Sequence, residues 1–196
     1  MTANPVTITK DASVEEAIQL MKTRFIRHLP VVDGDKLVGW ITDANLRGAL
    51  FPSMLEDLTI EDVMIHDPIA VEASESIEAA ARLLVENRIG GMPVLENGEL
   101  VGVITVIDLL NAFLIMLGIL QSSSRIDVKP GTSQGAIDSI SSIIEKENGE
   151  IISVCLVPQK SGVGQIYSFR LGRCDAEKIV EELEKEGHKV VSYSTC

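Results

Sequence analysis

The segment Gly39-Trp40-Ile41-Thr42-Asp43-Ala44-Asn45 returns 63 positions later as Gly102-Val103-Ile104-Thr105-Val106-Ile107-Asp108. In this register residues 1–49 align with 64–112 without a gap, and sixteen of the 49 pairs are identical. Composition alone supplies only a few such matches. The chain therefore contains a tandem repeat, and both repeats should adopt the same fold.

Each repeat begins with a short predicted strand and a helix. The strands are extended runs at 6–9 and 69–71. Ser13, with Glu16 three residues later, gives the first helix a capping-box start. Both helices have apolar residues at the spacing i, i+3, i+4, i+7, which predicts one buried face. These residues are Val14, Ala17, Ile18 and Met21 in the first repeat and Ile77, Ala80, Ala81 and Leu84 in the second.

A hairpin and a second helix follow in each repeat. In the first repeat, strand-like runs at 29–32 and 37–42 flank a turn rich in Asp and Gly, and residues 95–98 form the matching turn of the second. A helix then begins near Asp43 and near Ile107. The predicted unit is β-α-β-β-α.

Two such units, each with a Pro-Val strand and a Gly-x-Ile-Thr-x-x-[Asn/Asp] segment before the last helix, resemble a tandem of cystathionine-β-synthase (CBS) domains. This regulatory pair is called a Bateman module. The segment 61–68 (EDVMIHDP) resembles the lead-in of the family. The resemblance covers residues 1 to about 119. It implies an α/β (α+β) fold, with one CBS unit at 1–57 and a second at 58–121.

A hydroxyl followed three residues later by a carboxylate at a helix start suits a nucleotide, because phosphate and ribose then both meet polar groups beside free backbone N–H groups. The resemblance implies an adenosine nucleotide in the cleft between the units. It places Thr on phosphate, Asp on ribose and the backbone before the Pro-Val strand on adenine. The matching residues of the second repeat are Thr105, Asp108, Gly91, Met92 and Pro93, with Ile69, Ala70 and Val71 of its lead-in strand. Those of the first repeat are Thr42, Asn45, His28, Leu29 and Pro30.

The two sites differ in chemistry. Asn45 stands where the second repeat has Asp108. An amide accepts through one oxygen and without charge assistance, so we expect weaker ribose binding in the first site. Arg24 and Arg27 lie close to His28 in the first repeat and offer positive charge to phosphates.

These residues also have structural interpretations. Threonines are common helix caps, and Asp108 is a first-turn acid that the helix dipole favours. Arg24 and Arg27 are equally well explained as solvated surface charges. His28 lies beside an apolar strand and is as well explained by packing as by ligand contact.

Residues 122–196 form a third predicted unit, separated by the polar break Ser122-Ser123-Ser124. Its β-α-β-β-α-β order is the ferredoxin-like arrangement. The predicted elements are strand 125–129, helix 133–147 ended by Gly149, strands 151–158 and 165–171, a helix from Asp175 to Gly187, and strand 189–193. The inward residues are Ile137, Ile140, Ile143 and Ile144 on the first helix and Ile179, Val180 and Leu183 on the second.

With Val128-Lys129-Pro130-Gly131 between its first strand and helix, this unit resembles an ACT domain. The resemblance implies an amino-acid site at Pro130, Gly131 and Thr132, where glycine permits close approach and the helix start presents N–H groups to a carboxylate. Dimerisation or packing is the alternative role of this unit. Two CBS units followed by an ACT-like unit are similar to the bacterial acetoin-utilisation protein family, which indicates a genetic context more than an activity.

Composition excludes several classes of function. The 196 residues include 17 Lys+Arg, 29 Asp+Glu and 4% aromatic residues, with a formal net charge of −12. Such a chain lacks the basic and aromatic surface that nucleic-acid binding needs. Three cysteines without C-x-x-C spacing favour a reduced, cytoplasmic setting and no metal site. His66 and His188 have no partner at metal-ligand spacing and are predicted to lie on the surface.

The stretch 109–120 (LLNAFLIMLGIL) is the most apolar in the chain. It is too short to span a bilayer, and the first residues have no signal-peptide pattern, so we expect no membrane association. We expect this stretch to support a homodimer by burying its outer face.

The expected function is that of a cytoplasmic sensor. It binds an adenosine nucleotide as a regulatory ligand and relays occupancy to a regulated protein or to the ACT-like unit. No nucleophile-base pair, metal cluster or Walker loop occurs in the sequence, so neither catalysis nor a catalytic cofactor is expected. The alternatives are an interaction or dimerisation scaffold with degenerate nucleotide sites, and an amino-acid sensor acting through the ACT-like unit.

Overall fold

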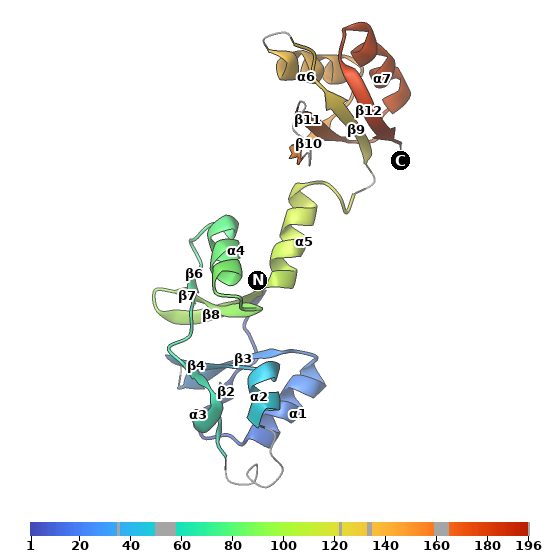
Figure 1. The fold of residues 1–196 in the computed structure, drawn as a ribbon. Coiled ribbons are helices and arrows are strands. Elements are labelled where there is room, and N and C mark those ends of the chain that lie inside the picture. The colour runs from blue at the N-terminus through green and yellow to red at the C-terminus, as the bar shows by residue number, and fades with distance from the viewer. Residues whose placement is uncertain (35, 50–57, 122, 133–134, 159–164, 196) are drawn as a thin grey trace. The chain divides into compact units, whose positions relative to one another are not determined.

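The computed structural model describes residues 1–34, 36–49, 58–121, 123–132, 135–158 and 165–195 (Figure 1). It divides into two compact units, Met1–Leu110 and Asn111–Cys196. The division lies within one helix, α5, and earlier than the predicted boundary at 121. The residues just after α5 belong to the second unit because they are bonded to it: Ser153 Oγ donates to the carbonyl oxygen of Leu117 at 3.0 Å.

Both repeats have the predicted order β-α-β-β-α. Their leading strands are only two residues long, and a short helix, α3, Ile60–Val63, precedes the second repeat without having been predicted. The first repeat contains β2 (Ile8–Thr9), α1 (Val14–Arg24), β3 (His28–Asp33), β4 (Lys36–Thr42) and α2 (Asp43–Ala49). The second contains β6 (Val71–Glu72), α4 (Ile77–Glu86), β7 (Gly91–Glu96), β8 (Glu99–Thr105) and α5 (Val106–Met116).

The helix that opens each repeat starts in the same way. Ser13 Oγ accepts a hydrogen bond from the backbone N–H of Glu16 at 3.1 Å, as the capping pattern predicted. Its counterpart Ser76 accepts from the backbone N–H of Ala79, also at 3.1 Å. Ser13 and Ser76, an identical pair in the repeat alignment, therefore cap their helices in the same way.

Each repeat completes its sheet with a strand from the other. β1, Thr2–Ala3, belongs to the first repeat and pairs antiparallel with β8 of the second. β5, Ile65–His66, belongs to the second repeat and pairs antiparallel with β4 of the first. The two sheets have the strand orders β1-β8-β7-β6 and β2-β3-β4-β5. Backbone hydrogen bonds therefore join the repeats in both directions.

Gly39 and Gly102 lie where the exchanged strands approach most closely. A Cβ on Gly102 would lie 3.0 Å from the carbonyl oxygen of Thr2. A Cβ on Gly39 would lie 3.2 Å from the carbonyl oxygen of Ile65. Both distances are shorter than ordinary van der Waals contact. Close backbone approach explains why the repeat has glycine at both positions.

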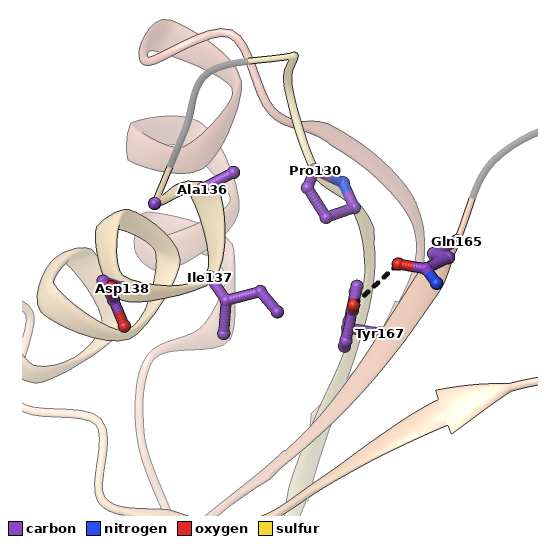
Figure 2. A pocket seen from close by; sticks show the side chains of 7 residues that line it. Pro130, Ala136, Ile137, Asp138, Gln165 and Tyr167 are labelled. Atoms are coloured by element: carbon purple, nitrogen blue, oxygen red, sulfur yellow. Dashed lines mark hydrogen bonds between the residues drawn. The ribbon is translucent and has the colours of Figure 1, made fainter.

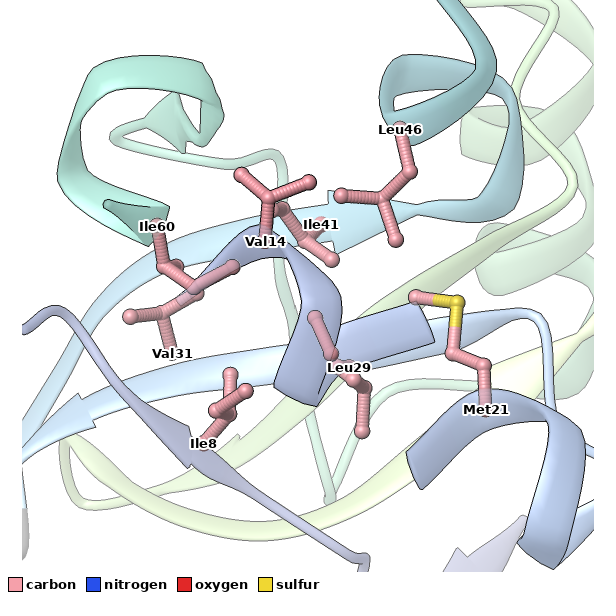
Figure 3. Close-up of a cluster of buried hydrophobic side chains, with 9 residues drawn as sticks. Ile8, Val14, Met21, Leu29, Val31, Ile41, Leu46 and Ile60 are labelled. Atoms are coloured by element: carbon pink, nitrogen blue, oxygen red, sulfur yellow. The ribbon is translucent and has the colours of Figure 1, made fainter. Parts of the chain in front are cut away.

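The hydrophobic core of the first repeat lies between its sheet and its helices (Figure 3). β3 is buried at three successive positions, so both of its faces are covered. Full burial of one such aliphatic side chain contributes about 1.5–3 kcal/mol. The buried side chains are Ile8, Val14, Ala17, Met21, Leu29, Val31, Ile41, Leu46 and Ile60.

The second compact unit has the predicted order β-α-β-β-α-β after the end of α5. Its four strands form an antiparallel sheet in the order β10-β11-β9-β12. The inward residues Ile140, Ile144, Ile179 and Leu183 are fully buried, as predicted. The elements are β9 (Ser124–Lys129), α6 (Ala136–Lys146), β10 (Ile151–Val157), β11 (Ile166–Leu171), α7 (Ala176–Lys185) and β12 (Lys189–Ser194).

The first helix of this unit differs from the prediction at both ends. Residues 133–134 of its predicted start lie outside the described part of the chain. Ile137 is 38% exposed because it faces a surface cavity rather than the core. At the other end Asn148, with φ +61°, reverses the chain before Gly149 is reached. Glycine is needed at position 149 for a different reason, because a Cβ there would lie only 3.0 Å from the carbonyl oxygen of Ile144.

The surface prediction for His188 is wrong, because its side chain is only 4% exposed. Gly187 turns the chain at φ +83° and directs His188 back into the unit. There His188 Nδ1 accepts from the backbone N–H of Gly131 at 3.2 Å, and Nε2 lies 3.2 Å from Ser139 Oγ. His66 is exposed on β5, as predicted.

Gly102→Val should destabilise the first compact unit, because the added side chain has no room between β8 and β1. We expect the free energy of unfolding to fall by about 1–3 kcal/mol, as for other overpacking changes. Trp40 is the single tryptophan of the chain and lies in this unit, so its fluorescence during urea unfolding reports the change. The matched control is Glu99→Val, at an exposed position of the same strand. Equal destabilisation by the two variants would contradict this interpretation.

Candidate functional site

Thr105 and Asp108 form a closed hydrogen-bonded pair where β8 meets α5. Thr105 Oγ1 donates to Asp108 Oδ2 at 2.6 Å, and the backbone N–H of Thr105 donates to the same oxygen at 2.9 Å. The backbone N–H of Asp108 donates in turn to Thr105 Oγ1 at 3.3 Å. The pair therefore caps the helix and leaves Asp108 Oδ1 outside the cap. Oδ1 lies 3.8 Å from the amino group of Met1.

Thr42 and Asn45 form the same cap in the first repeat. Asn45 Oδ1 accepts from the backbone N–H of Thr42 at 3.2 Å and from Thr42 Oγ1. The backbone N–H of Asn45 donates to Thr42 Oγ1 at 3.1 Å. Because the amide oxygen is committed to the cap, the group that remains is Nδ2, which can only donate. Asp108 offers a charged acceptor at the equivalent place, so the two repeats differ as predicted.

Both caps border one cleft of about 930 Å³ within the first compact unit. The first residue of each capped helix is held by an equivalent backbone hydrogen bond. The N–H of Asp43 donates to the carbonyl oxygen of Arg27 at 3.0 Å, and the N–H of Val106 donates to that of Gly90 at 3.1 Å. Of the predicted nucleotide-site residues, seven line the cleft: Arg27, His28, Thr42, Asn45, Ile69, Gly91 and Thr105.

The other predicted residues do not line the cleft. Asp108 is not itself among the lining residues, although Thr105, its partner in the cap, is. Leu29 and Met92 are fully buried in the hydrophobic interior, which explains their absence from the cleft surface. Arg24 is exposed at the end of α1 and is not among the lining residues, although the next four residues are. Pro30, Pro93, Ala70 and Val71 are also outside the lining.

Several lining residues were missed by the sequence analysis. Trp40, Phe25 and Arg88 face the cleft, as do Asn4, Pro5 and Val6 of the first lead-in segment and Asp67 and Pro68 of the second. The register of the repeat could have found part of this set, because Pro5 matches Pro68 and Phe25 matches Arg88. Phe25 is 95% exposed and has φ +55°, the backbone conformation that Arg88 shares at φ +54°.

His28 lines the cleft and is half-buried. Its ring stacks on Trp40, with centroids 5.6 Å apart and planes at 26°. Burial lowers the pKa of His28 below its ordinary value of 6.5, and the positive charge of Arg27 lowers it further. The ring is therefore neutral at neutral pH.

Positive charge at the cleft comes from Arg27 and Arg88. Asp43 also lines the cleft, but its carboxylate is paired with Arg47 at 2.6 Å. Residues 1–119 hold 8 basic and 18 acidic residues, so the surrounding field is negative. An anionic ligand must therefore be held by local groups, namely these arginines and the N–H groups at the starts of the two helices.

The predicted amino-acid site lies in the second compact unit, beside a cavity of about 450 Å³ (Figure 2). Pro130 lines this cavity, but Gly131 and Thr132 do not. The backbone N–H of Gly131 already donates to Nδ1 of His188. Gly131 lies close to the backbone of Gly187, since a Cβ on Gly131 would be 3.2 Å from the carbonyl oxygen of Gly187. The N–H group of Gly131 is therefore occupied, and the predicted carboxylate contact with the N–H groups at the helix start remains a prediction. Figure 2 shows Ile137 of α6 and Tyr167 of β11 on the two sides of the cavity, and Tyr167 Oη donates to Gln165 Oε1 at 2.8 Å.

The described residues contain neither a candidate metal site nor a candidate membrane span. No group of three or more His, Cys, Asp and Glu side chains among them could hold a metal ion. None of the helices they form is long and apolar enough to cross a membrane.

The sequence profile of the CBS domain matches residues 1–52 and 60–115, more than half of the chain. The chain belongs to the CBS domain family. The two matches coincide with the two repeats, so the CBS pair is the part of the molecule that contains the cleft.

Three solved structures share the fold of this CBS pair. One is CBSX2 of Arabidopsis thaliana in complex with AMP, 30% identical, with a TM-score of 0.52, covering 59% of this chain and 93% of that one. Another is the CBS pair of protein MJ0100 with 5′-methylthioadenosine and S-adenosyl-L-methionine, 31% identical, TM-score 0.53, covering 57% and 93%. The third is a candidate acetoin utilization protein (AcuB) of Vibrio cholerae, 29% identical, TM-score 0.55, covering 61% and 90%.

Two curated relatives are matched over less than half of their own length. Protein MJ1225 of Methanocaldococcus jannaschii is 32% identical over 119 residues, which is 60% of this chain and 41% of that protein. Inosine-5′-monophosphate dehydrogenase of Korarchaeum cryptofilum is 36% identical over 104 residues, 53% of this chain and 21% of the enzyme. The similarity to the dehydrogenase is confined to the CBS region and gives no support for enzyme activity in this chain.

Acidification should destabilise the first compact unit through His28. In the unfolded chain His28 takes up a proton at its ordinary pKa of 6.5, whereas in the folded chain its pKa is lower. Below about pH 6.5 the unfolded chain therefore binds more protons than the folded chain, and the free energy of unfolding falls as the pH is lowered. We expect urea unfolding, followed by Trp40 fluorescence, to show a larger loss from about pH 7.5 to about pH 5.5 in the wild type than in His28→Gln. An equal loss in both proteins would show that His28 is not the group responsible.

Proposed function

We propose that this protein is a regulatory sensor that binds an adenosine nucleotide in the cleft of its CBS pair, with the second repeat holding the ribose. The observation that carries the proposal is Oδ1 of Asp108, the carboxylate oxygen that the cap to Thr105 does not use and that lies 3.8 Å from the amino group of Met1 at the start of α5. Ribose hydroxyls donate to such an acceptor, and charge-assisted hydrogen bonds are the stronger kind. The complexes of CBSX2 with AMP and of MJ0100 with adenosine derivatives support the class of ligand.

The size and the wall of the cleft also support a nucleotide. Its volume of about 930 Å³ is within the range usual for small-molecule sites. Apolar side chains such as Ile69 and Ile107 offer contacts for a base, and Arg27 and Arg88 offer charge to a phosphate. Ligand occupancy then shifts the protein toward whichever arrangement binds the ligand more tightly, and a regulated partner or the C-terminal unit senses that arrangement.

We further infer that the C-terminal unit is of the ACT type. Its β-α-β-β-α-β order, its antiparallel sheet and the two helices support this inference. The amino-acid function has less support than the nucleotide function, because the amide of Gly131 is already bonded to His188. The acetoin-utilisation context is supported by the likeness to the Vibrio cholerae protein over the CBS pair.

A homodimer is also part of the proposal. α5 buries only Leu109, while several apolar side chains on it and just after it are exposed. Ile115 is 58% exposed, Met116 55% and Leu120 60%. Exposed apolar surface of this kind marks an interface, and a second copy of the chain is the simplest partner.

The nucleotide prediction is tested by isothermal titration calorimetry with AMP and S-adenosylmethionine. We expect Asp108→Asn to weaken binding about 10- to 100-fold, because the change keeps the cap to Thr105 but removes the charged acceptor, a hydrogen bond of about 1.5–3 kcal/mol. Asn45→Ala is the matched control at the equivalent position and should change the affinity by less than about threefold.

The outcome of this titration distinguishes a nucleotide sensor from an interaction scaffold. A thermal-shift panel that adds ADP, ATP, NADH and cyclic di-AMP extends the search, and a ligand at 100 times its Kd should stabilise the protein by about 2.7 kcal/mol. If none of these ligands binds the wild type, the scaffold function takes the place of the sensor. If Asn45→Ala has the larger effect, the ribose is held by the first repeat instead.

The dimer is tested by sedimentation velocity of the full chain. We expect a dimer for the wild type and a monomer for the double variant Ile115→Glu, Met116→Glu, because charge on an apolar interface is costly to bury. Val85→Glu is the matched control, since Val85 is 75% exposed on a different helix, α4. A monomeric wild type contradicts this part of the proposal.

A further inference from the structure

Residues with a left-handed backbone gather at the cleft of the CBS pair. Six described residues other than glycine have φ between +48° and +61°, and four of the six line the cleft. The four form two pairs in the repeat alignment, Asn4 with Asp67 and Phe25 with Arg88. Residues with side chains adopt this conformation at a cost, and such strain is concentrated at functional sites. Both repeats therefore accept strained backbone at the cleft.

Phe25 and Arg88 stand at equivalent ends of the helices α1 and α4. The N–H of Phe25 donates to the carbonyl oxygen of Lys22 at 3.4 Å, and the N–H of Arg88 donates to that of Val85 at 3.2 Å. Glycine is the usual residue where a helix ends in the left-handed conformation, because it has no Cβ. The helix ends alone would favour glycine at both positions, so they do not explain the side chains of Phe25 and Arg88.

Core packing does not explain the phenylalanine either. Phe25 is 95% exposed and is not part of the hydrophobic core of the first repeat, yet it lines the cleft. An aromatic ring is a large apolar surface that contributes to binding when a ligand covers it. Arg88 is also exposed and lines the same cleft. The two equivalent helix ends therefore present a flat apolar ring in the first repeat and a positive charge in the second.

We propose that Phe25 contacts the base of the bound nucleotide and that its counterpart Arg88 contacts only the phosphate. The inference rests on the proposed nucleotide function and specifies which repeat receives each end of the ligand. A purine base is flat, and aromatic side chains stack on such bases. A phosphate monoester carries about two negative charges at neutral pH and pairs with a guanidinium group. Arg88 belongs to the same repeat as Asp108, so the second repeat holds phosphate and ribose while Phe25 of the first repeat covers the base.

The test compares AMP with 5′-methylthioadenosine, which has the same base and ribose but no phosphate, by isothermal titration calorimetry of the full chain. We expect Phe25→Gly to weaken the binding of both ligands about 5- to 150-fold, the usual effect of truncating an aromatic residue that stacks on a base. Phe25→Tyr keeps the ring and should bind both ligands within about threefold of the wild type. Arg88→Gly is the matched control at the equivalent position, and it should weaken AMP about 10- to 100-fold while leaving 5′-methylthioadenosine within about threefold.

Stability distinguishes this role of Phe25 from a structural one. Glycine adopts φ +55° without strain, so the urea midpoint of Phe25→Gly, followed by Trp40 fluorescence, should be unchanged or raised. A lowered midpoint would show that Phe25 serves the fold and would overturn the inference. Unchanged affinity of Phe25→Gly for both ligands, or a loss confined to AMP, would also overturn it while leaving nucleotide binding intact. If neither ligand binds the wild type, the proposed function itself fails.

Discussion

The backbone hydrogen bonds of two short exchanged strands, β1 and β5, join the halves of the CBS pair. Each strand is only two residues long, yet each adds to the sheet of the other repeat, β1 on β8 and β5 on β4. Gly102 and Gly39 make this possible because any side chain there would meet the exchanged backbone. Since the two sheets are tied together in this way, the two helix caps border a single cleft, and every feature of the site depends on that arrangement.

The two repeats have nearly the same fold, but their helix caps differ in the chemical group that each presents. Both caps have the same hydrogen-bond pattern, so helix capping and ligand binding are not competing explanations of Thr105 and Asp108. The cap uses one carboxylate oxygen of Asp108, and the second lies outside the cap, 3.8 Å from the amino group of Met1. In Asn45 the same cap uses the only acceptor of the side chain. On this account a single difference between carboxylate and amide decides which repeat can accept from a ribose.

Much of this could be predicted from the sequence, because repeat register and helical periodicity are local signals. The alignment of 1–49 with 64–112 placed both CBS units, and Ser13 marked a helix start that the structure confirms. The exchanged strands could not be predicted, since two residues carry no periodicity. His188 was misplaced because its partner Gly131 lies 57 positions away, a contact that only the folded chain creates. Trp40 was missed for a similar reason, since its counterpart Val103 gave no sign of an aromatic stack at the cleft.

The central claim is that Asp108 of the second repeat holds the ribose of an adenosine nucleotide. A crystal structure of the full chain grown with AMP tests it most directly. We predict AMP in the cleft, with a ribose hydroxyl about 2.6–3.2 Å from Asp108 Oδ1. AMP bound with its ribose on Asn45, or bound outside the cleft altogether, would contradict the account.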